Sequence, residues 1–215
     1  MAIDPPMQFC PRCGADALAW AVPAGDDRER QVCGACGAIH YRNPRNVAGC
    51  IVEHDGRILL CRRSIEPRSG YWTFPAGFLE NGESLVAAAA RETAEEACAR
   101  ATDLELHALF NLTHIGQVYA VFRGRVPDGR ADAGAESLSV DWFEEAAIPW
   151  DELAFPVIHE ALRLYLADRR AGRFGVHMGD IFRRDSGELV IRHHDGSEHV
   201  ASHDFRRAPR LKRGS

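Results

Sequence analysis

Three glutamates, Glu92, Glu95 and Glu96, stand at positions i, i+3 and i+4 of an alanine-rich segment. The run Ala87–Ala90 favours a helix, and Ser84 is a suitable N-cap, so we expect a helix that ends near residue 99. On such a helix the three carboxylates share one face. A stripe suited to burial lies on a different side of the helix and consists of Val86, Ala90, Thr93 and Ala97.

Carboxylates this close together repel one another and destabilise the helix unless a positive charge lies among them. Mg²⁺ or Mn²⁺ is the natural candidate, because hard cations bind carboxylate oxygens and Mg²⁺ commonly shares its shell with substrate phosphates and water. For the three glutamates considered alone, a solvated acidic helix face is the alternative explanation. The residues around them favour the metal site.

The surrounding segment resembles the Nudix box, G-x₅-E-x₇-R-E-U-x-E-E-x-G-U, in which U is a bulky apolar residue. Six residues match it at the required separations, namely Gly77, Glu83, Arg91, Glu92, Glu95 and Glu96. The segment departs from the pattern where Cys98 replaces the last glycine and where Thr93 and Ala99 replace bulky apolar residues. These are packing positions, so the departures concern the local helix geometry and leave the chemistry intact.

The resemblance implies an α+β Nudix fold, in which a mixed β-sheet lies between α-helices and a loop–helix–loop forms the active site. It also implies that Glu92, Glu95 and Glu96 hold Mg²⁺ or Mn²⁺, with the main-chain carbonyl of Ala76 as a further ligand. Water would then attack a phosphorus of a diphosphate while the metal neutralises charge on the phosphoryl oxygens.

The same resemblance implies roles for three further residues. Arg91 would orient a box carboxylate, and Glu83 would support the loop or a metal-bound water. The general base of Nudix enzymes is either a box glutamate or a glutamate of a distant loop, and Glu136 is the loop candidate here. Taken alone, Glu136 is also typical of an ordinary surface glutamate. Its position before the strand expected at 138–143 favours the functional interpretation.

The remaining pattern in the middle of the chain predicts a mixed sheet. Val47–Glu53 and Arg57–Arg62 have the pattern of two strands joined by a turn at residues 54–56. Further strands are expected at 104–113, 117–126 and 137–143, and a second helix at 155–170. The order β-β-α-β-β-β-α fits a mixed sheet flanked by helices.

Two pairs of cysteines near the N-terminus predict a structural zinc site. Cys10 and Cys13 form one C-x₂-C pair, Cys33 and Cys36 form the other, and the x₁₉ spacing between the pairs lies within the zinc-ribbon range. Four thiolates close a tetrahedral Zn²⁺ site, and the ion supplies folding energy that so short a segment lacks. Four unrelated free cysteines, or iron in the same cage, are the alternatives. For the ribbon we favour a packing or dimer role.

The overall composition limits the possible partners and location. A net charge of −5 argues against a general nucleic-acid binder, which usually shows a basic surface. No uninterrupted apolar stretch is long enough to cross a bilayer and no signal-peptide pattern stands at the start, so we expect a cytoplasmic protein with no membrane partner. The other three cysteines are expected in the buried core, namely Cys50, Cys61 and Cys98.

The resemblance extends beyond the box to zinc-ribbon Nudix hydrolases of plants and bacteria that act as FAD/ADP-ribose pyrophosphatases. The similar pieces are the two cysteine pairs, HYRNP at 40–44, LLCRRSIEPRSGYWTFPAGFLENGES at 59–84, IGQVYAVF at 115–122 and GAESL at 134–138. This implies a small nucleotide diphosphate as substrate, either FAD cleaved to FMN and AMP or ADP-ribose cleaved to AMP and ribose 5-phosphate. NADH pyrophosphatases are the close alternative, but their SQPWPFPxS array is absent between Ala99 and Val126.

Three residues outside the box are candidates for substrate binding. Tyr71 and Trp72 have aromatic faces that suit flat rings, and Gln117 lies in the expected strand 117–126. Each also has an ordinary structural explanation: support of the loop by the two aromatic rings, and a solvated strand-edge position for Gln117.

Two functions of other classes are also compatible with these features. A Nudix-like module that senses a nucleotide without hydrolysis usually loses box carboxylates, whereas all of them stand here. An RNA-processing enzyme, for example one that removes caps, is disfavoured by the acidic balance and by the lack of interleaved basic and aromatic residues.

We divide the chain into a zinc ribbon at 1–43, a Nudix domain at 44–172 and a polar C-terminal extension at 173–215, and by analogy we expect a homodimer. Glu188–His193 has the pattern of a short strand. The extension contains four histidines that we expect to be solvated instead of metal-bound, His193, His194, His199 and His203. Its end is basic through Arg206, Arg207, Arg210, Lys212 and Arg213.

Overall fold

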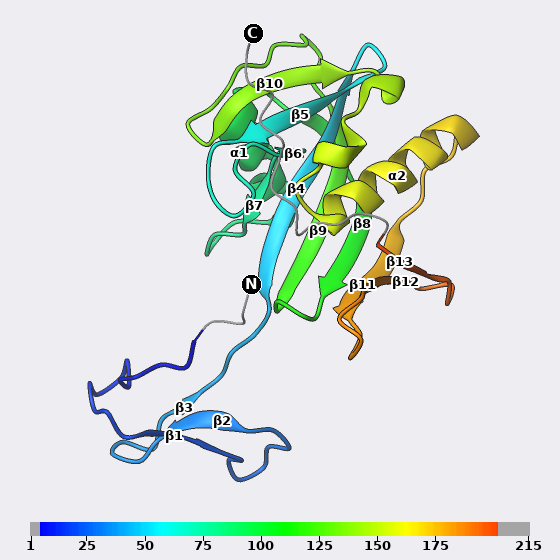
Figure 1. Ribbon diagram of the computed structural model, residues 1–215. Helices are drawn as coiled ribbons and strands as arrows, with labels where there is room; N and C mark the ends of the chain where they lie inside the picture. Colours follow the sequence, from blue (N-terminus) through cyan, green and yellow to red (C-terminus); the bar gives the residue numbers. More distant parts are fainter. Residues whose placement is uncertain (1–4, 202–215) are drawn as a thin grey trace, which may run out of the picture. The chain divides into compact units, whose positions relative to one another are not determined.

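The computed structural model describes residues 5–201, and the chain divides into two compact units between Pro44 and Arg45 (Figure 1). The first unit is a three-stranded antiparallel sheet with the order β1–β2–β3. Its strands are β1 (Leu18–Ala21), β2 (Arg30–Cys33) and β3 (Ile39–His40).

Each cysteine pair of the first unit closes a tight turn. The N–H of Gly14 donates to the carbonyl of Cys10, and the N–H of Gly37 donates to the carbonyl of Cys33, both at 2.8 Å. Both glycines have positive φ, +76° and +69°, a conformation that glycine adopts without steric cost. The two turns bring the four cysteines together, as the zinc-ribbon prediction requires.

The second unit is built on a ten-stranded mixed sheet. Eight strands follow the order β10–β5–β4–β9–β8–β11–β12–β13, while β6 pairs with β5 and β7 pairs with β4. The pairs β4–β9 and β8–β11 are parallel and the other pairs are antiparallel. The strands are β4 (Arg45–His54), β5 (Arg57–Arg63), β6 (Trp72–Thr73), β7 (Ala76–Phe78), β8 (Thr102–Leu112), β9 (Gln117–Arg125), β10 (Ser137–Phe143), β11 (His177–Arg183), β12 (Leu189–His193) and β13 (Glu198–Val200).

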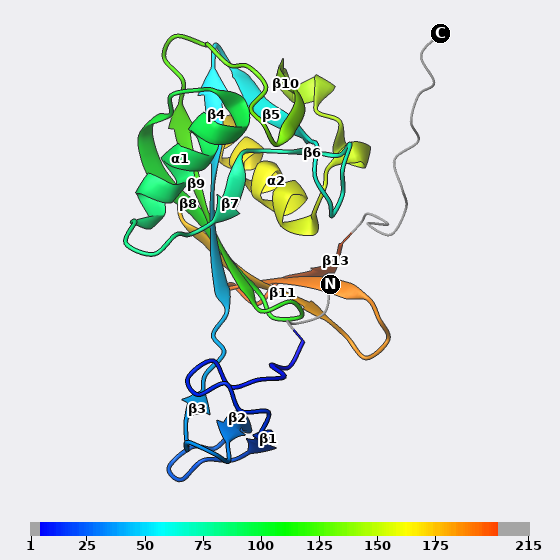
Figure 2. The same cartoon turned by 90° about the vertical axis from the view of Figure 1, so that its left-hand side faces the viewer.

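Two helices lie on opposite sides of this sheet, α1 (Leu85–Ala97) and α2 (Pro156–Ala171), as Figure 2 shows. Two short 3₁₀ turns, η1 (Glu145–Ala147) and η2 (Trp150–Glu152), precede α2. The strand residues alternate between two buried clusters because successive side chains point to opposite faces. On β4, for example, Ile51 packs with the α2 cluster, whereas Cys50 and Val52 pack with the α1 cluster. The predicted mixed sheet between helices is confirmed.

The helix α1 begins as expected, and of the predicted buried stripe Thr93 and Ala97 are buried whereas Ala90 is half-buried. The hydroxyl oxygen of Ser84 accepts a hydrogen bond from the N–H of Ala87 at 3.1 Å and caps the helix. Val86, expected in the buried stripe, is exposed. The buried residues are Ala88, Ala89, Glu92, Thr93, Glu96 and Ala97. The small alanines pack against the sheet, and two of the glutamates turn inward with them.

The C-terminal segment corrects the expected polar extension, because residues 177–200 add three strands to the sheet. β11 pairs in parallel with β8, and β12 and β13 follow it. Ile181, Val190 and Ile191 are buried, so this segment shares the core of the second unit. The short strand expected at 188–193 is confirmed as β12. Of the residues singled out in the extension, His203 and the basic residues from Arg206 to Arg213 lie outside the described residues.

Two further expectations can be compared with the structure. Cys50 and Cys61 are buried as expected, whereas Cys98 is exposed because it stands directly after the last turn of α1. Within residues 5–201, neither helix has the length and apolar character needed to cross a membrane.

Candidate active site

The guanidinium group of Arg91 connects the glutamates of the box. Its Nε and Nη2 donate to the two carboxylate oxygens of Glu83 at 3.1 and 2.7 Å. Its Nη1 donates to Glu92 at 2.7 Å and to Glu95 at 2.9 Å. Nη2 also donates to the carbonyl oxygen of Phe78 at 3.0 Å, which ties the loop to the helix. Arg91 thus holds three carboxylates and the loop in one hydrogen-bonded arrangement.

Glu83 fixes the loop that precedes α1. Besides its two bonds with Arg91, it accepts a hydrogen bond from the N–H of Glu80 at 2.7 Å. The hydrogen bond with Arg91 is the main reason why the pKa of Glu83 is lowered, so this carboxyl group stays ionised. Glu83 therefore connects Arg91 to the loop through these hydrogen bonds.

Gly77 lies where the loop passes directly over Glu92. A Cβ atom added to Gly77 would lie 2.2–2.4 Å from the carboxylate atoms of Glu92, closer than any non-bonded contact allows. A glycine at this position therefore lets the backbone approach the carboxylate. Burial raises the pKa of Glu92, and Arg91 opposes that shift.

Glu96 is the most buried of the three box carboxylates at the end of α1. Its Oε2 accepts a hydrogen bond from the N–H of Ala76 at 3.2 Å, so the loop and helix meet here as well. Burial raises the pKa of Glu96 to about 8, and the nearby negative charges of Glu92 and Glu136 act in the same direction. A divalent cation beside Glu96 would favour its ionised form.

Glu95 occupies a more open position than its two neighbours, with 59% of its side chain exposed. Among the described residues, the carboxylates of Glu92, Glu95 and Glu96 do not meet within 4.8 Å as the ribbon sulfurs do. Two of them share Arg91, and the third is held by the loop at Ala76. The carboxylates nevertheless lie on adjoining turns of α1 beside one loop, and oxygen donors of this kind fit a hard divalent ion.

A second loop packs against the end of α1. The N–H of Gly134 and the hydroxyl of Ser137 both donate to the carbonyl oxygen of Glu96, at 3.1 and 2.7 Å. A Cβ atom on Gly134 would lie 1.7 Å from the carbonyl oxygen of Glu95, so the loop approaches the helix too closely for a side chain. Glu136 lies in this loop, and its negative charge contributes to the raised pKa values of Glu92 and Glu96, after burial and the closer groups.

The two aromatic candidates for substrate binding lie in the interior. Trp72 is 9% exposed, pairs with Arg62 in the sheet and makes an edge-to-face contact with Phe143 at 5.0 Å between centroids. Tyr71 is 5% exposed, with the guanidinium of Arg68 4.8 Å from its ring centre. Because both rings are already packed, the structure favours loop support over ligand stacking, most clearly for Trp72.

Gln117 and Arg63 complete the surroundings of the site. Gln117 begins β9 and is 8% exposed, so it is not the solvated edge residue that was the structural alternative. Arg63, which the sequence analysis did not single out, lies close enough to Glu96 to lower its pKa and stacks over the ring of Phe155. The sequence feature that could have indicated Arg63 is its position at the end of a predicted strand, just before the loop that leads to the box.

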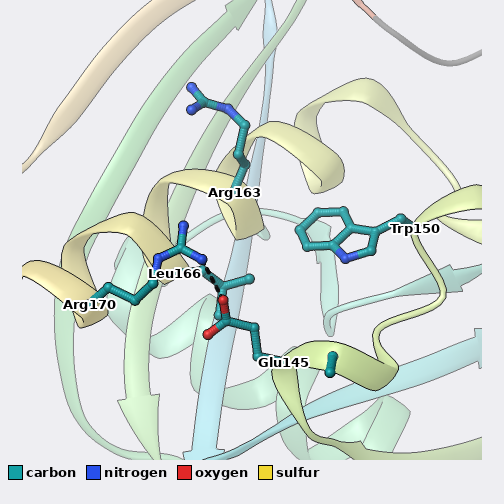
Figure 3. Close-up of a pocket in the computed structure, with 6 residues that line it drawn as sticks. Glu145, Trp150, Arg163, Leu166 and Arg170 are labelled. Atoms are coloured by element: carbon teal, nitrogen blue, oxygen red, sulfur yellow. Dashed lines mark hydrogen bonds and ion pairs between the residues drawn. The ribbon is translucent and has the colours of Figure 1, made fainter.

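A cavity of the second unit lies apart from this site. Its volume is about 450 Å³, it lies beside α2, and Figure 3 shows Arg170 pointing towards Glu145 in its lining. Their ion pair measures 2.5 Å, and Arg169 binds the same carboxylate at 2.9 Å. None of the box residues lines this cavity, so it does not belong to the glutamate site.

The four cysteines of the first unit fit a zinc ion. The sulfur of Cys10 lies 3.8 Å from that of Cys36, and the sulfur of Cys13 lies 3.7 Å from that of Cys33. Zinc–sulfur bonds of about 2.3 Å in a tetrahedron place sulfur atoms about 3.8 Å apart. His40 Nε2 lies 3.4 Å from the sulfur of Cys10, where it can donate to a thiolate.

Comparison with known proteins agrees with this geometry. The NUDIX domain model matches residues 42–165, and the model of the Nudix N-terminal zinc ribbon matches residues 8–42. Together they cover residues 8–165, which include the first unit's cysteines and the segment that carries the box, but not the strands β11, β12 and β13. The chain therefore belongs to the Nudix hydrolase family and carries the zinc ribbon found at the N-terminus of some of its members.

Three individual proteins of known name or structure are similar to this chain. The crystal structure of a NUDIX hydrolase from Nitrosomonas europaea is 46% identical, covers 82% of this chain and 100% of its own, and superposes with a TM-score of 0.79. The NAD-capped RNA hydrolase NudC of Vibrio vulnificus is 33% identical over 67% of this chain. An ADP-ribose pyrophosphatase of Methanocaldococcus jannaschii is 39% identical over 26% of this chain. The matched segments span only 50% and 33% of the last two proteins.

Proposed function

We propose that this protein hydrolyses the diphosphate bond of a nucleotide derivative in which ADP is joined to a second group. The observation that carries this proposal is the arrangement of Arg91, which holds Glu83, Glu92 and Glu95 while Glu96 is backed by the N–H of Ala76. Four acidic side chains preorganised around one loop can hold the cations that a reaction at negatively charged phosphate oxygens needs.

Glu92, Glu95 and Glu96 would hold Mg²⁺ or Mn²⁺, with the carbonyl oxygen of Ala76 as a further candidate ligand. When bound, the ion would neutralise charge on the phosphoryl oxygens of the substrate. Arg91 would keep Glu92 and Glu95 in place for this purpose, because its Nη1 already binds both. Glu83 would keep Arg91 itself in position through two hydrogen bonds.

The attacking water needs a carboxylate that accepts its proton. Glu136 is the candidate from the second loop, because its charge acts on both Glu92 and Glu96 and the loop is fixed to α1 through Gly134. A box glutamate is the alternative. The substitution Glu136→Gln distinguishes the two candidates. A lower kcat with an unchanged KM supports Glu136 as the general base, whereas full activity shows that a box glutamate accepts the proton.

For the substrate we propose ADP-ribose or FAD, each of which contains an ADP group. The resemblance of residues 10–181 to FAD/ADP-ribose pyrophosphatases supports this choice, and so does the Methanocaldococcus relative named as an ADP-ribose pyrophosphatase. NADH or another NAD-containing molecule is the second candidate, because the Vibrio relative is named as an NAD-capped RNA hydrolase. All these compounds share the ADP half and differ in the group beyond the diphosphate.

The test is hydrolysis by the purified full chain with Mg²⁺ or Mn²⁺, with AMP release followed by chromatography. The substrates are ADP-ribose, FAD, NADH and an NAD-capped RNA at equal concentration. Preference for ADP-ribose or FAD supports the proposal, and preference for NADH or the capped RNA supports the second candidate. Binding of these nucleotides without any hydrolysis would overturn the proposed reaction and favour a nucleotide-sensing module.

A homodimer and a cytoplasmic location stay predictions of this function. The sedimentation velocity of the purified chain tests the first, since a dimer sediments faster than a single chain of 23.8 kDa.

A further inference from the structure

A second group of metal-ligating side chains lies apart from the glutamate site, where three elements of the second unit meet. His107 belongs to β8, Asp168 to the last turns of α2, and His177 is the first residue of β11. One possible ligand atom from each residue lies within 4.8 Å of the other two. Two imidazoles and one carboxylate are ligands that zinc and related divalent ions prefer.

His107 supplies an independent reason to expect a ligand here. Its side chain has no exposed surface, and its Nε2 lies 3.2 Å from the carbonyl oxygen of Ala161. Because a carbonyl can only accept, Nε2 must carry the proton, which leaves Nδ1 with a free lone pair. Nδ1 has no hydrogen-bond partner and lies 4.0 Å from the Oδ2 of Asp168. A buried polar atom without a partner is uncommon and requires an explanation.

The other two residues are arranged around the same point. His177 Nε2 lies 2.8 Å from the Oδ2 of Asp168, and the N–H of Gly175 donates to the same oxygen at 3.2 Å. The side chain of Asp168 is 15% exposed and that of His177 is 26% exposed. The group is therefore anchored at its buried end by His107 and can be reached from solvent at the other.

We infer that His107 Nδ1, Asp168 Oδ2 and His177 Nε2 form a binding site for a divalent transition-metal ion such as Zn²⁺. Around a tetrahedral zinc ion with bonds of about 2.0–2.1 Å, neighbouring ligand atoms lie about 3.3 Å apart. The observed separations of 2.8 and 4.0 Å lie on either side of that value. When the metal binds, His177 takes the neutral tautomer with its proton on Nδ1, by exchange with solvent, so that Nε2 offers its lone pair to the ion, and a water molecule completes the fourth position.

The site would fasten the C-terminal strands to the body of the unit. His177 begins β11, which pairs in parallel with β8, and the chain reaches it from Asp168 through the end of α2 and a short loop. A metal ion joining α2, β8 and β11 would fix this connection at its start. The expected effect is a gain in stability when the ion binds, with no direct role in the proposed hydrolysis.

A neighbouring group made of Glu160, His193 and His199 satisfies the same distance limit but is already neutralised. Arg163 donates to both oxygens of Glu160, at 2.6 and 3.1 Å. Both oxygens of this carboxylate are therefore bonded to a cation, whereas Glu92 and Glu95 each give only one oxygen to Arg91. The first group has no such cation bonded to its carboxylate among the described residues, which is why we place the metal at Asp168.

The test is the zinc content of the purified full chain, measured by mass spectrometry after dialysis against zinc-free buffer. We expect about two zinc ions per chain, one in the cysteine site and one here. His177→Gln and Asp168→Asn should each reduce this to about one. His194→Gln, an exposed histidine outside both groups, is the matched control and should keep about two.

The same samples show where a second ion resides. His199→Gln should keep about two ions, so loss of one ion in this variant, with retention in His177→Gln, would overturn the assignment. A wild-type chain with only about one zinc would overturn it without any variant. In addition, after all bound metal has been removed with a chelator, Zn²⁺ added back should raise the melting temperature of the second unit by a few degrees in the wild type, and it should not do so for His177→Gln.

Discussion

At the scale of single residues, Arg91 holds the candidate active site together because one planar guanidinium group reaches three carboxylates and a loop carbonyl. A lysine could not replace these contacts, since it offers one compact charge where arginine offers a rigid fork of donors. The carboxylates that Arg91 holds can approach each other without the repulsion that three free glutamates would experience.

The first prediction concerns the two inward-facing glutamates. Glu92→Gln and Glu96→Gln should each lower kcat/KM at least roughly 10²-fold, because a neutral amide is a poor ligand for a hard divalent ion. The fold should survive, since glutamine has the same shape. Glu80→Gln, a change to an exposed glutamate of the same loop, is the control for general effects. Near-normal turnover in both variants, with melting temperatures unchanged, would contradict the assignment of Glu92 and Glu96 as metal ligands.

A second prediction concerns Cys98, which follows α1 with φ of +48° in the left-handed region. A residue with a side chain in this region costs roughly 1–2 kcal/mol, and glycine avoids that cost. Part of the benefit is lost because glycine increases the conformational entropy of the unfolded state. Cys98→Gly should therefore raise the free energy of unfolding by about 0.5–1 kcal/mol, measured by urea denaturation. Cys98→Ala removes the same thiol and keeps the strain, so it should not stabilise the chain. Equal stability of the two variants would contradict this account.

At the scale of elements, the active-site loop and α1 act as one piece. Gly77→Ala should push the carboxylate of Glu92 aside, because the added Cβ would lie within 2.4 Å of it. Since the end of the glutamate side chain can move, stability should fall little, while activity should drop roughly tenfold or more. Gly175→Ala, where nothing lies within 4 Å of the new atom, should leave both unchanged. Activity of Gly77→Ala within twofold of wild type would show that the close approach does not matter.

The three C-terminal strands should carry a substantial part of the stability of the second unit. Ile181 of β11 is fully buried in the α2 cluster, so Ile181→Ala should cost roughly 2–5 kcal/mol of unfolding free energy. Val176→Ala, which changes an exposed residue just before β11, should cost less than about 0.5 kcal/mol. Thermal unfolding followed by circular dichroism compares the two. Similar melting temperatures would show that β11 is only loosely attached.

The elements that could be predicted from the sequence are those that depend on short separations. The N-cap Ser84, the alanine run and the spacing of the glutamates predict α1 because capping and helical periodicity act within a few residues. The turn at 54–56 predicts the hairpin of β4 and β5 for the same reason. The buried face of α1 was predicted only in part, at Thr93 and Ala97, because the rest depends on how closely the alanines let the helix approach β4.

The C-terminal strands show where sequence patterns stop being informative. β11 pairs with β8, about 70 residues earlier in the chain, and nothing local in a polar segment indicates a partner so distant. His107 illustrates the same limit: a histidine in a strand gives no sign that Asp168 and His177 will lie beside it. In the candidate site, Glu136 could be proposed only through the family pattern, and Arg63 was missed.

At the scale of the whole molecule, the chain combines two units that are stabilised in different ways. The second unit has two buried clusters on either side of a large sheet. The first has three short strands of two to four residues and is mostly exposed, so it cannot bury enough apolar surface to fold unaided. Its stability should come from zinc held by four cysteines.

The last prediction follows from this difference. Substitution of both Cys13 and Cys36 by serine should abolish zinc binding in the first unit and unfold it, while the second unit keeps its thermal transition. Limited proteolysis should then remove the first unit and leave a stable fragment that begins near Arg45, where the two units divide. Cys98→Ser, which changes an exposed cysteine of the second unit, should leave the whole chain resistant. If the doubly substituted chain resisted proteolysis like the wild type, zinc would not be what folds the ribbon. If instead both units unfolded together, the stability of the second unit would depend on the folded ribbon.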